Sequence, residues 1–417
     1  MNLSARAGRI AVSPTMKVAA DAMKMKAQGI DVVDFGAGEP DFPTPAHIGA
    51  AAHRAIDANF TKYTNNAGTE DLKRAIVERY KIDNGVDYLP SEVICSAGGK
   101  QALFNSVLAL FGPGDEVITH MPGWPTLVEQ IKLAEATPVI VRSQPENGFA
   151  LTADTLLAAI TPRTRGMILN SPDNPTGAVI SEAELEIIAK EAARRGIWIL
   201  MDLCYDKLIY DPVPHNVIGV LARHHRDRAV LCGSASKVYA MTGWRCGWTV
   251  GPAALVSACN AIQSHSTSNV CSITQKAVEA ALRGPQDCVT EMLDEYRRRR
   301  DRLVEWLSAD PRIGLKKPAG AFYLFPDVSE FLSPDGYRTS SELATALLND
   351  AHVALTPGEA FDTPGFLRIA ADPRVPREPR RRSCRFHLTL STCSAPSSER
   401  STSGPTPRRR RPTAPTR

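Results

Sequence analysis

One run of the chain, SASKVYAMTGWRCGW at residues 234–248, places a lysine among side chains that could hold an anion. Lys237 follows a strand-like segment, AVLCGS, and open α/β sheets bind ligands beyond the carboxyl ends of their strands. Ser234 lies three residues before Lys237 and Arg245 lies eight residues after it. These side chains could reach one phosphate while the lysine amine forms a Schiff base with an aldehyde. The alternative is a solvated lysine in an exposed loop.

A second segment could bind an anion through its backbone. Gly98, Gly99 and Lys100 open a helical run, KQALF, and the N–H groups of a helix N-terminus form a ready anion site that glycines allow a ligand to approach closely. The segment is not a Walker A loop, because Gln101 follows the lysine and the upstream glycine is absent. No G-x-G-x-x-G follows a strand either, so a nicotinamide site lacks its main support.

The elements that must position these groups alternate between short apolar runs and helical stretches from about residue 44 to residue 297. The apolar runs are EVICSA, DEVITHM, TPVIVRS, RGMILN, WILMDL, AVLCGS and GWTVGP, and the helical stretches include KQALFNSVLALF and SEAELEIIAKEAARRG. This alternation predicts a mainly parallel sheet with helices on both faces. Ser181 and Glu184 have the spacing of a capping box, and Gly196 marks the end of the same helix.

The pattern changes from about Tyr296 onward. A charged helix, EYRRRRDRLVEWLSAD, is followed by GAFYLFPDV, a helix near SELATALLNDA and a strand pair around VALTP and FLRIA, which together predict a smaller α+β domain. We expect the arginine run at 297–300 to form a solvated helix face. After Ala371 the chain turns to Arg, Pro, Ser and Thr, with eight prolines and no apolar period, and such a segment is predicted to be disordered.

Composition limits the remaining function classes. The chain has 417 residues, of which 43% are hydrophobic, enough for two or three domains. The net charge is +4, but residues 371–417 alone carry +9, so residues 1–370 carry −5 and any nucleic-acid partner would rest on the tail. We expect no such partner. Nine cysteines scattered without a Cys-x-x-Cys pair indicate neither a disulfide framework nor a zinc site, and His224 and His225 have no partners at ligand spacing. We predict no metal, no membrane span and a cytoplasmic location.

Nine segments in order and in register carry a resemblance to a known family. They are SPTMKVAADA, GAGEPDFPTP, TKYTNNAG, GGKQALFN, NSPDNPTGAV, AMTGWR, QSHSTSN, GAFYLFPDV and FLRIA, between about residue 3 and Ala370. The chain resembles the class I aminotransferases, which are fold-type I enzymes dependent on pyridoxal 5'-phosphate (PLP), and is most similar to the bacterial aspartate aminotransferase branch. Two departures stand out: Leu203 and Cys204 replace the usual Glu-Ile after Asp202, and PGWPTL around Trp124 has glycine and proline where aromatic or hydroxyl residues are common.

The resemblance implies the PLP-dependent transferase fold type I, an α/β fold with a large α/β/α domain around a mainly parallel sheet and a smaller α+β domain. The implied limits are an N-terminal arm at 1–12, a small substrate domain at 13–43 together with 298–370, a large PLP-binding domain at 44–297, and the tail at 371–417. After Ala370 the family usually continues into an amphipathic helix. A shifted reading frame would produce the tract that stands there instead.

The resemblance also implies cofactor contacts. Lys237 would hold PLP, the Asp202 carboxylate would pair with the pyridinium nitrogen, and Asn174 and Tyr205 would hydrogen-bond the phenolic oxygen of the ring. Trp124 resembles the residue that stacks on the ring. The phosphate contacts would come from Gly98, Gly99, Lys100, Ser234 and Arg245. The alternatives are a helix cap for Asp202, a tight turn for Asn174, and core aromatic residues for Tyr205 and Trp124.

Substrate contacts and assembly follow from the same resemblance. Arg368 would clamp the substrate α-carboxylate with its planar guanidinium, and Gly38 would approach that carboxylate through its backbone. Trp124 and Asn174 would also line the substrate site, and Lys100 could face a distal carboxylate. Tyr63 would reach the phosphate in the neighbouring subunit, so complete sites require a homodimer.

The implied reaction is a two-step amino transfer. The substrate amine displaces Lys237, whose freed amine moves a proton between the substrate α-carbon and the cofactor, and a second 2-oxo acid then reverses the sequence. Aspartate or glutamate with 2-oxoglutarate are the expected substrates. The alternatives are a β-elimination or decarboxylation on the same scaffold, a cofactor-sensing regulator, which should carry a DNA-binding domain ahead of this fold, and an inactive product with a truncated small domain.

Overall fold

The computed structural model describes residues 4–11, 14–210 and 214–371. The predicted disorder of the tail beyond residue 371 therefore falls outside the described residues. The α-helices are α1 (Ala5–Arg9), α2 (Pro14–Ala27), α3 (Ala46–Asp57), α4 (Glu70–Asn84), α5 (Gly99–Leu110), α6 (Pro125–Leu133), α7 (Ala153–Ala158), α8 (Glu182–Arg195), α9 (Val217–His224), α10 (Ala235–Val238), α11 (Ala253–Ser264), α12 (Ser272–Arg283), α13 (Asp287–Leu307) and α14 (Ser340–Ala351). The strands are β1 (Val33–Asp34), β2 (Val93–Ser96), β3 (Glu116–Met121), β4 (Thr137–Arg142), β5 (Thr164–Asn170), β6 (Trp198–Asp202), β7 (Ala229–Ser234), β8 (Gly247–Val250), β9 (Tyr323–Leu324), β10 (Val353–Ala354), β11 (Thr356–Pro357) and β12 (Leu367–Ala370).

A seven-stranded sheet in the order β2-β8-β7-β6-β5-β3-β4 forms the centre of the large part of the molecule. The pairs from β4 through β7 are parallel, and β8 runs antiparallel to both β7 and β2. All seven apolar runs predicted from the sequence form these strands, so the α/β fold class with a mainly parallel sheet is confirmed. Because the parallel strands end at one edge, the residues that follow them meet there.

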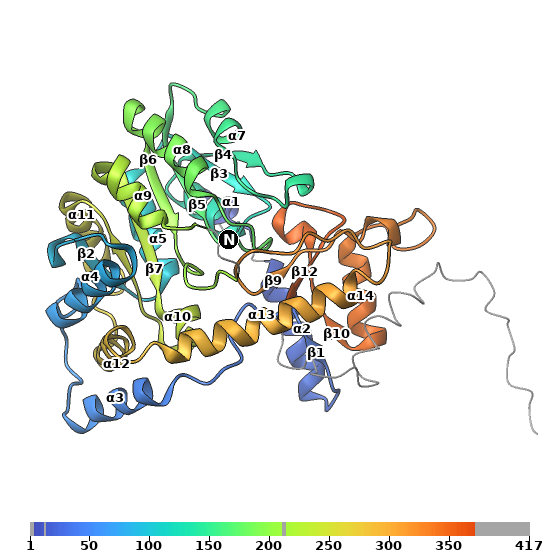
Figure 1. The fold of residues 1–417 in the computed structure, drawn as a ribbon, viewed down its shortest axis with the longest axis horizontal. Helices are drawn as coiled ribbons and strands as arrows, with labels where there is room; N and C mark the ends of the chain where they lie inside the picture. Colours follow the sequence, from blue (N-terminus) through green and yellow to red (C-terminus); the bar gives the residue numbers. More distant parts are fainter. Residues whose placement is uncertain (1–3, 12–13, 211–213, 372–417) are drawn as a thin grey trace, which may run out of the picture.

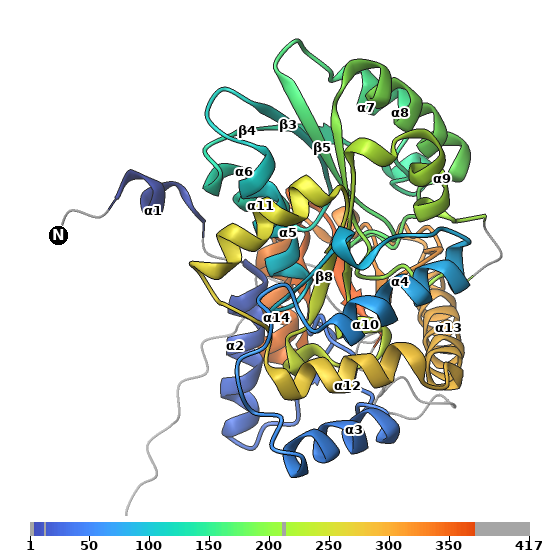
Figure 2. The ribbon, with the colours of Figure 1, turned by 90° about the vertical axis from the view of Figure 1, so that its left-hand side faces the viewer.

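Helices cover both faces of this sheet, as the sequence predicted. Alternate side chains along a strand point to opposite faces. Met167 and Leu169 of β5 therefore join a core cluster with α4, α8, α9 and α12, whereas Ile168 between them joins another cluster with α5, α6 and α11. Figure 2 shows α7, α8 and α9 on one side of the strands and α5, α6 and α11 on the other. This burial on both faces explains why the strands are nearly continuous apolar runs.

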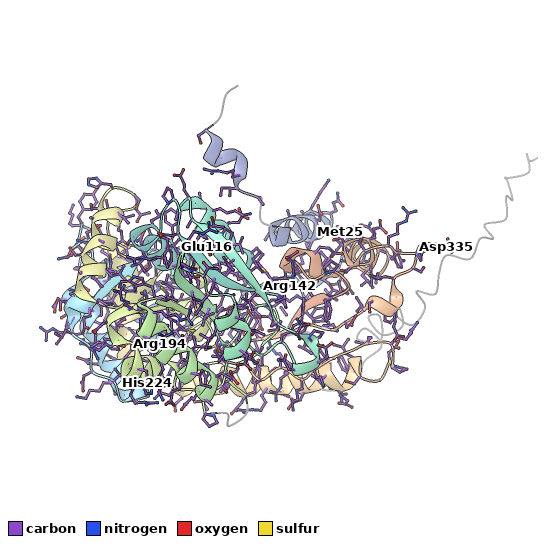
Figure 3. All side chains as sticks on the ribbon, turned by 90° about the horizontal axis from the view of Figure 1, so that it is seen from above. Met25, Glu116, Arg142, Arg194, His224 and Asp335 are labelled. Atoms are coloured by element: carbon purple, nitrogen blue, oxygen red, sulfur yellow. The ribbon has the colours of Figure 1, made fainter. Side chains whose placement is uncertain are left out.

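The C-terminal part contains two small sheets. β11, β12 and β9 form an antiparallel sheet, which confirms the predicted strand pair, and β1 pairs in parallel with β10. Helix α13 extends from the large sheet toward α14 (Figure 1), and Met292, Tyr296, Leu303 and Leu307 on one of its faces pack in the same core cluster as β9 and β12. Arg142 of β4 lies at the boundary of the two parts (Figure 3), where it forms an ion pair with Asp362 at 2.5 Å.

The prediction that the arginines at 297–300 form a solvated helix face is wrong for two of the four. Arg300 is only 1% exposed, lies against the ring of Tyr210 and donates a hydrogen bond to the Pro318 carbonyl oxygen at 3.0 Å. Arg299 is also buried and is paired with Asp41 at 2.6 Å. Both side chains lie where α13 crosses other segments, and their carboxylate and carbonyl partners compensate the burial of the charge.

The predicted helix signals around α8 are confirmed with one change. Ser181 accepts a hydrogen bond from the Glu184 N–H, and Gly196 ends the helix with a left-handed φ of 69°. The Glu184 carboxylate does not turn back to the start of its own helix; it accepts from the Ala153 N–H at the start of α7. The same residue spacing therefore joins two neighbouring helices instead of closing a capping box. Among the helices of the described ranges, none combines the length and apolar character that a bilayer span requires.

Candidate active site

A cavity of about 370 Å³ lies at the carboxyl edge of the large sheet, where the C-terminal part closes over it. Eleven of the thirteen residues singled out in the sequence line it: Gly38, Gly99, Lys100, Trp124, Asn174, Asp202, Tyr205, Ser234, Lys237, Arg245 and Arg368. The other lining residues are Gly36, Ala37, Leu103, Asn170, Cys204, Ser236, Thr242 and Tyr323. Segments as distant in sequence as residues 36 and 368 therefore share one cavity. No cluster of three metal-ligating side chains occurs in the part of the chain that the structure describes.

Lys237 lies in the short helix α10, directly after β7, with its amine inside the cavity. Its Nζ donates a hydrogen bond to the Gly38 carbonyl oxygen. Burial lowers the pKa of Lys237, and the positive charges of Arg368 and Arg245 act in the same direction, whereas Glu39 opposes them. A lowered pKa increases the fraction of neutral amine, which is the nucleophilic form.

Asp202 ends β6 with a buried carboxylate. The residue is 4% exposed, and its Oδ1 accepts a hydrogen bond from the Cys204 N–H at 3.0 Å. Burial raises the pKa of Asp202 to about 7, and the charges of Asp173 and Asp206 add to the shift. None of the described residues forms an ion pair with it. The site around Asp202 therefore favours a bound group that carries a proton or a positive charge.

The N-terminus of α5 forms a close-fitting cradle with the loops after β7. Gly98, with a φ of 93°, caps the helix, and a Cβ added there would lie 2.4 Å from the Arg245 guanidinium. A Cβ on Gly99 would lie 3.2 Å from the Ser234 Cβ. Arg245 itself donates to the Thr242 and Ala97 carbonyl oxygens at 2.9 and 3.3 Å. Helix N–H groups, hydroxyls and a guanidinium are the donors that a phosphate requires.

Arg368 of β12 enters the cavity from the C-terminal part. It is 3% exposed, and its Nη1 and Nη2 donate to Asn174 Oδ1 at 3.0 Å and to the Gly36 carbonyl oxygen at 2.8 Å. Its guanidinium carbon lies 4.6 Å from the centroid of the Tyr323 ring. Among the described residues, Arg368 Nε is buried without a hydrogen-bond partner. A carboxylate bound in the cavity would supply an acceptor to this guanidinium.

The opposite wall of the cavity combines a lysine and a tryptophan. Lys100 Nζ lies 5.0 Å from the centroid of the Trp124 ring, within the range of a cation–π contact. Burial lowers the pKa of Lys100, and repulsion from Arg245 contributes. Trp124 immediately precedes α6, and Pro125 is the first residue of that helix, so the aromatic side chain is held at the end of β3.

Eight cavity residues were not predicted as site residues, among them Tyr323 and Asn170, and two predicted residues, Gly98 and Tyr63, lie elsewhere. The Tyr323 hydroxyl is 2.8 Å from the Tyr205 hydroxyl, but a tyrosine within GAFYLFPDV reads as part of an apolar strand. Asn170 does carry a sequence signal, because it is a polar residue at the end of the apolar run RGMILN. Gly98 caps α5 beside the cavity without lining it. Tyr63 is 92% exposed and lies outside the cavity of its own chain.

Comparisons with known proteins agree on one family. The family model for aminotransferase class I and II matches residues 30–385. An aspartate aminotransferase of Bacillus sp. (strain YM-2) is 41% identical over 368 residues, covering 88% of this chain and 94% of the relative. An aspartate/prephenate aminotransferase of Cereibacter sphaeroides is 42% identical over 374 residues, covering 88% and 94%. The crystal structure of the Rhizobium meliloti aspartate aminotransferase superposes with a TM-score of 0.87 at 38% identity, covering 94% of this chain and 99% of the other.

Proposed function

Because the chain belongs to the class I and II aminotransferases, we propose that it transfers amino groups with PLP as cofactor, held by Lys237. The observation that carries this proposal is the convergence on one cavity of an amine with a lowered pKa, a buried carboxyl with a raised pKa and the N-terminus of α5. Each of these features has a matching group on PLP: the aldehyde, the ring nitrogen and the phosphate.

The residues fit the cofactor on structural grounds. A Cβ on Gly98 would lie 2.4 Å from the Arg245 guanidinium and one on Gly99 would lie 3.2 Å from the Ser234 Cβ, so glycine at both positions lets a ligand approach the backbone N–H groups of this helix end closely. The pKa of about 7 at Asp202 marks a carboxyl whose charge a pyridinium would stabilise. When bound, PLP supplies an aldehyde that takes up an amino group and a ring that stores electrons.

The chain's own residues perform the remaining work. Arg368 orients the substrate by its carboxylate, with its guanidinium already held by Asn174 and Gly36. Lys237, with its pKa lowered by burial, accepts the proton from the substrate α-carbon at Nζ. Asp202 holds a proton on the ring nitrogen. The Tyr205–Tyr323 hydroxyl pair keeps the Tyr205 oxygen in place at the cavity wall.

Aspartate or glutamate is the proposed amino donor, with 2-oxoglutarate as the acceptor. The support is a lysine, Lys100, on the wall that Trp124 shares, together with relatives at 41% and 42% identity that are named for aspartate or for aspartate and prephenate. A screen of amino donors against 2-oxoglutarate, with the new amino acid quantified, tests this assignment. A β-elimination or a decarboxylation would consume the donor without forming glutamate from 2-oxoglutarate, and such a result would overturn the proposal.

A homodimer with shared sites, a cytoplasmic location and the domain limits given above belong to the same proposal. The exposure of Tyr63 supports the dimer, because a fully exposed tyrosine outside its own cavity is free to contact a second subunit. Mixing Tyr63→Ala and Lys237→Ala subunits tests it directly. One of the two sites in a mixed dimer would contain both intact residues, so activity should reappear on mixing. If the mixture shows only the summed residual activities of the two variants, the shared site is contradicted.

A further inference from the structure

Asn170, the last residue of β5, is buried at 2% exposure and lines the cavity. Its Oδ1 accepts a hydrogen bond from the Asn174 N–H at 3.0 Å, and its Nδ2 donates to the Asp202 carbonyl oxygen at 3.1 Å. The two partners fix the orientation of the amide, because a backbone N–H can only donate and a carbonyl can only accept. One side chain therefore joins the loop after β5 to the end of β6.

The backbone of Asn170 extends this connection to a third strand. Its N–H donates to His120 Nε2 at 3.3 Å at the end of β3. The other ring nitrogen, Nδ1, lies 3.2 Å from the Pro122 carbonyl oxygen, so the imidazole carries its proton on Nδ1 and accepts at Nε2. A Cβ on Gly123 would lie 2.4 Å from the His120 carbonyl oxygen, which shows how tightly this turn is packed just before Trp124.

We propose that Asn170 is a positioning residue whose side chain sets the relative placement of Asp202 and Asn174 around the cofactor, while its backbone N–H links them to the turn before Trp124. This inference rests on the proposed function, in which these three residues contact the ring nitrogen, the phenolic oxygen and the ring face. The three residues come from separate segments that end at one edge of the sheet (Figure 1). Without the Asn170 side chain, the buried Asn174 N–H and Asp202 carbonyl oxygen would each lose a hydrogen bond, and the carbonyl oxygen would keep only the longer one from the Ser171 N–H at 3.5 Å.

The experiment compares Asn170→Ala with a matched loss of a buried amide elsewhere. Asn105 on α5 is equally buried, and its Nδ2 donates to Gln263 Oε1 at 3.0 Å without lining the cavity. Both alanine variants should lose similar stability in urea as cofactor-free proteins. Only Asn170→Ala should weaken PLP binding, by roughly 10- to 100-fold, and move the pH at which the absorbance of bound PLP changes. Equal PLP affinity and equal titration in the two variants would overturn the inference.

A double-mutant cycle with Asn174→Ala separates positioning from general destabilisation. If Asn170 acts through Asn174, the double variant should bind PLP little more weakly than Asn174→Ala alone, whereas independent effects would multiply. Fully multiplied losses would contradict the proposed placement of Asn174 by Asn170. Asn170→Asp keeps the shape of the side chain and the acceptor toward Asn174 but removes the donor toward Asp202. This variant should fold even if the alanine variant does not, and it should bind PLP more weakly than the unmodified protein. If instead the unmodified protein takes up no PLP that borohydride can fix to Lys237, the proposed function itself fails.

Discussion

Replacing Asp202 by asparagine should stabilise the cofactor-free protein at neutral pH, although it removes a proposed catalytic group. The Asp202 carboxyl has a pKa of about 7 in the fold, against an ordinary value of 3.8, because it is buried and faces the charges of Asp173 and Asp206. The folded protein therefore keeps this proton over a pH range in which the unfolded chain has released it. Between about pH 4 and pH 7 the unfolded state binds fewer protons, so the free energy of unfolding falls as the pH rises.

The size of the effect follows from the shift. A difference of about 3 pKa units at roughly 1.4 kcal/mol per unit corresponds to about 4 kcal/mol of stability that is present near pH 4 and lost by about pH 7. Asparagine does not titrate, so the Asp202→Asn variant lacks this loss. The difference in unfolding free energy between variant and unmodified protein should grow by up to about 4 kcal/mol over this pH range and then level off.

Urea unfolding of the cofactor-free proteins at a series of pH values measures this difference. Asp206, whose pKa burial raises to about 6, gives both proteins a pH slope of its own, so the test uses the difference between the two proteins and not the slope of either. The matched control is Asp335→Asn, the same substitution at an exposed position on the C-terminal part (Figure 3). If the unfolding free energies of Asp202→Asn and of the unmodified protein, plotted against pH, stay parallel from pH 4 to pH 8, the explanation by a buried charge is wrong. The same variant should bind PLP more weakly, because the ring nitrogen loses its counter-charge.

Three further predictions concern the cavity. Lys237→Ala should lose the borohydride-fixed cofactor and roughly 100-fold or more of the transfer rate while still binding PLP noncovalently, and a retained covalent adduct in this variant would refute the assignment. Lys100→Ser should raise KM for aspartate much more than KM for alanine, whereas an equal rise for both substrates would point to a phosphate or structural role. Gly247→Ala would place a Cβ 2.4 Å from the Gly99 nitrogen, so it should lower the stability of the protein by roughly 1–3 kcal/mol and also lower its affinity for PLP. The control is Gly243→Ala, which has no atom within 4 Å of the added Cβ and should change neither quantity. Unchanged PLP affinity in Gly247→Ala would show that the α5 N-terminus tolerates displacement.

The sequence predicted the strands and helices well where the signal is local. The runs RGMILN and WILMDL became β5 and β6 because a strand buried on both faces must be apolar along its whole length. Ser181 and Gly196 marked the ends of α8 because capping is decided within one turn of the helix. The roles of the individual site residues stay predictions that the variants above test, and the domain limits stay predictions as well.

Residues whose surroundings come from distant segments could not be placed in this way. Arg300 reads as one of four exposed arginines in the sequence, yet it is buried because Tyr210 and the Pro318 carbonyl group pack around α13. Glu184 has the spacing of a capping box, but the start of α7 supplies a nearer partner. Tyr323 looks like an ordinary strand residue until the cavity forms around it. In each case the outcome depends on what the fold brings against the side chain.

The sequence by itself determined which residues this protein can use for chemistry: a lysine after a strand, an aspartate at a strand end, a glycine-opened helix and an arginine in a late strand. These are local facts of residue type and position relative to an element, and local interactions fix the elements. Only the tertiary structure decided the state of those groups. The pKa of Lys237 is lowered and that of Asp202 is raised because the packed molecule removes water from both, and Arg368 reaches Asn174 across 194 residues of chain because the C-terminal part closes over the edge of the sheet.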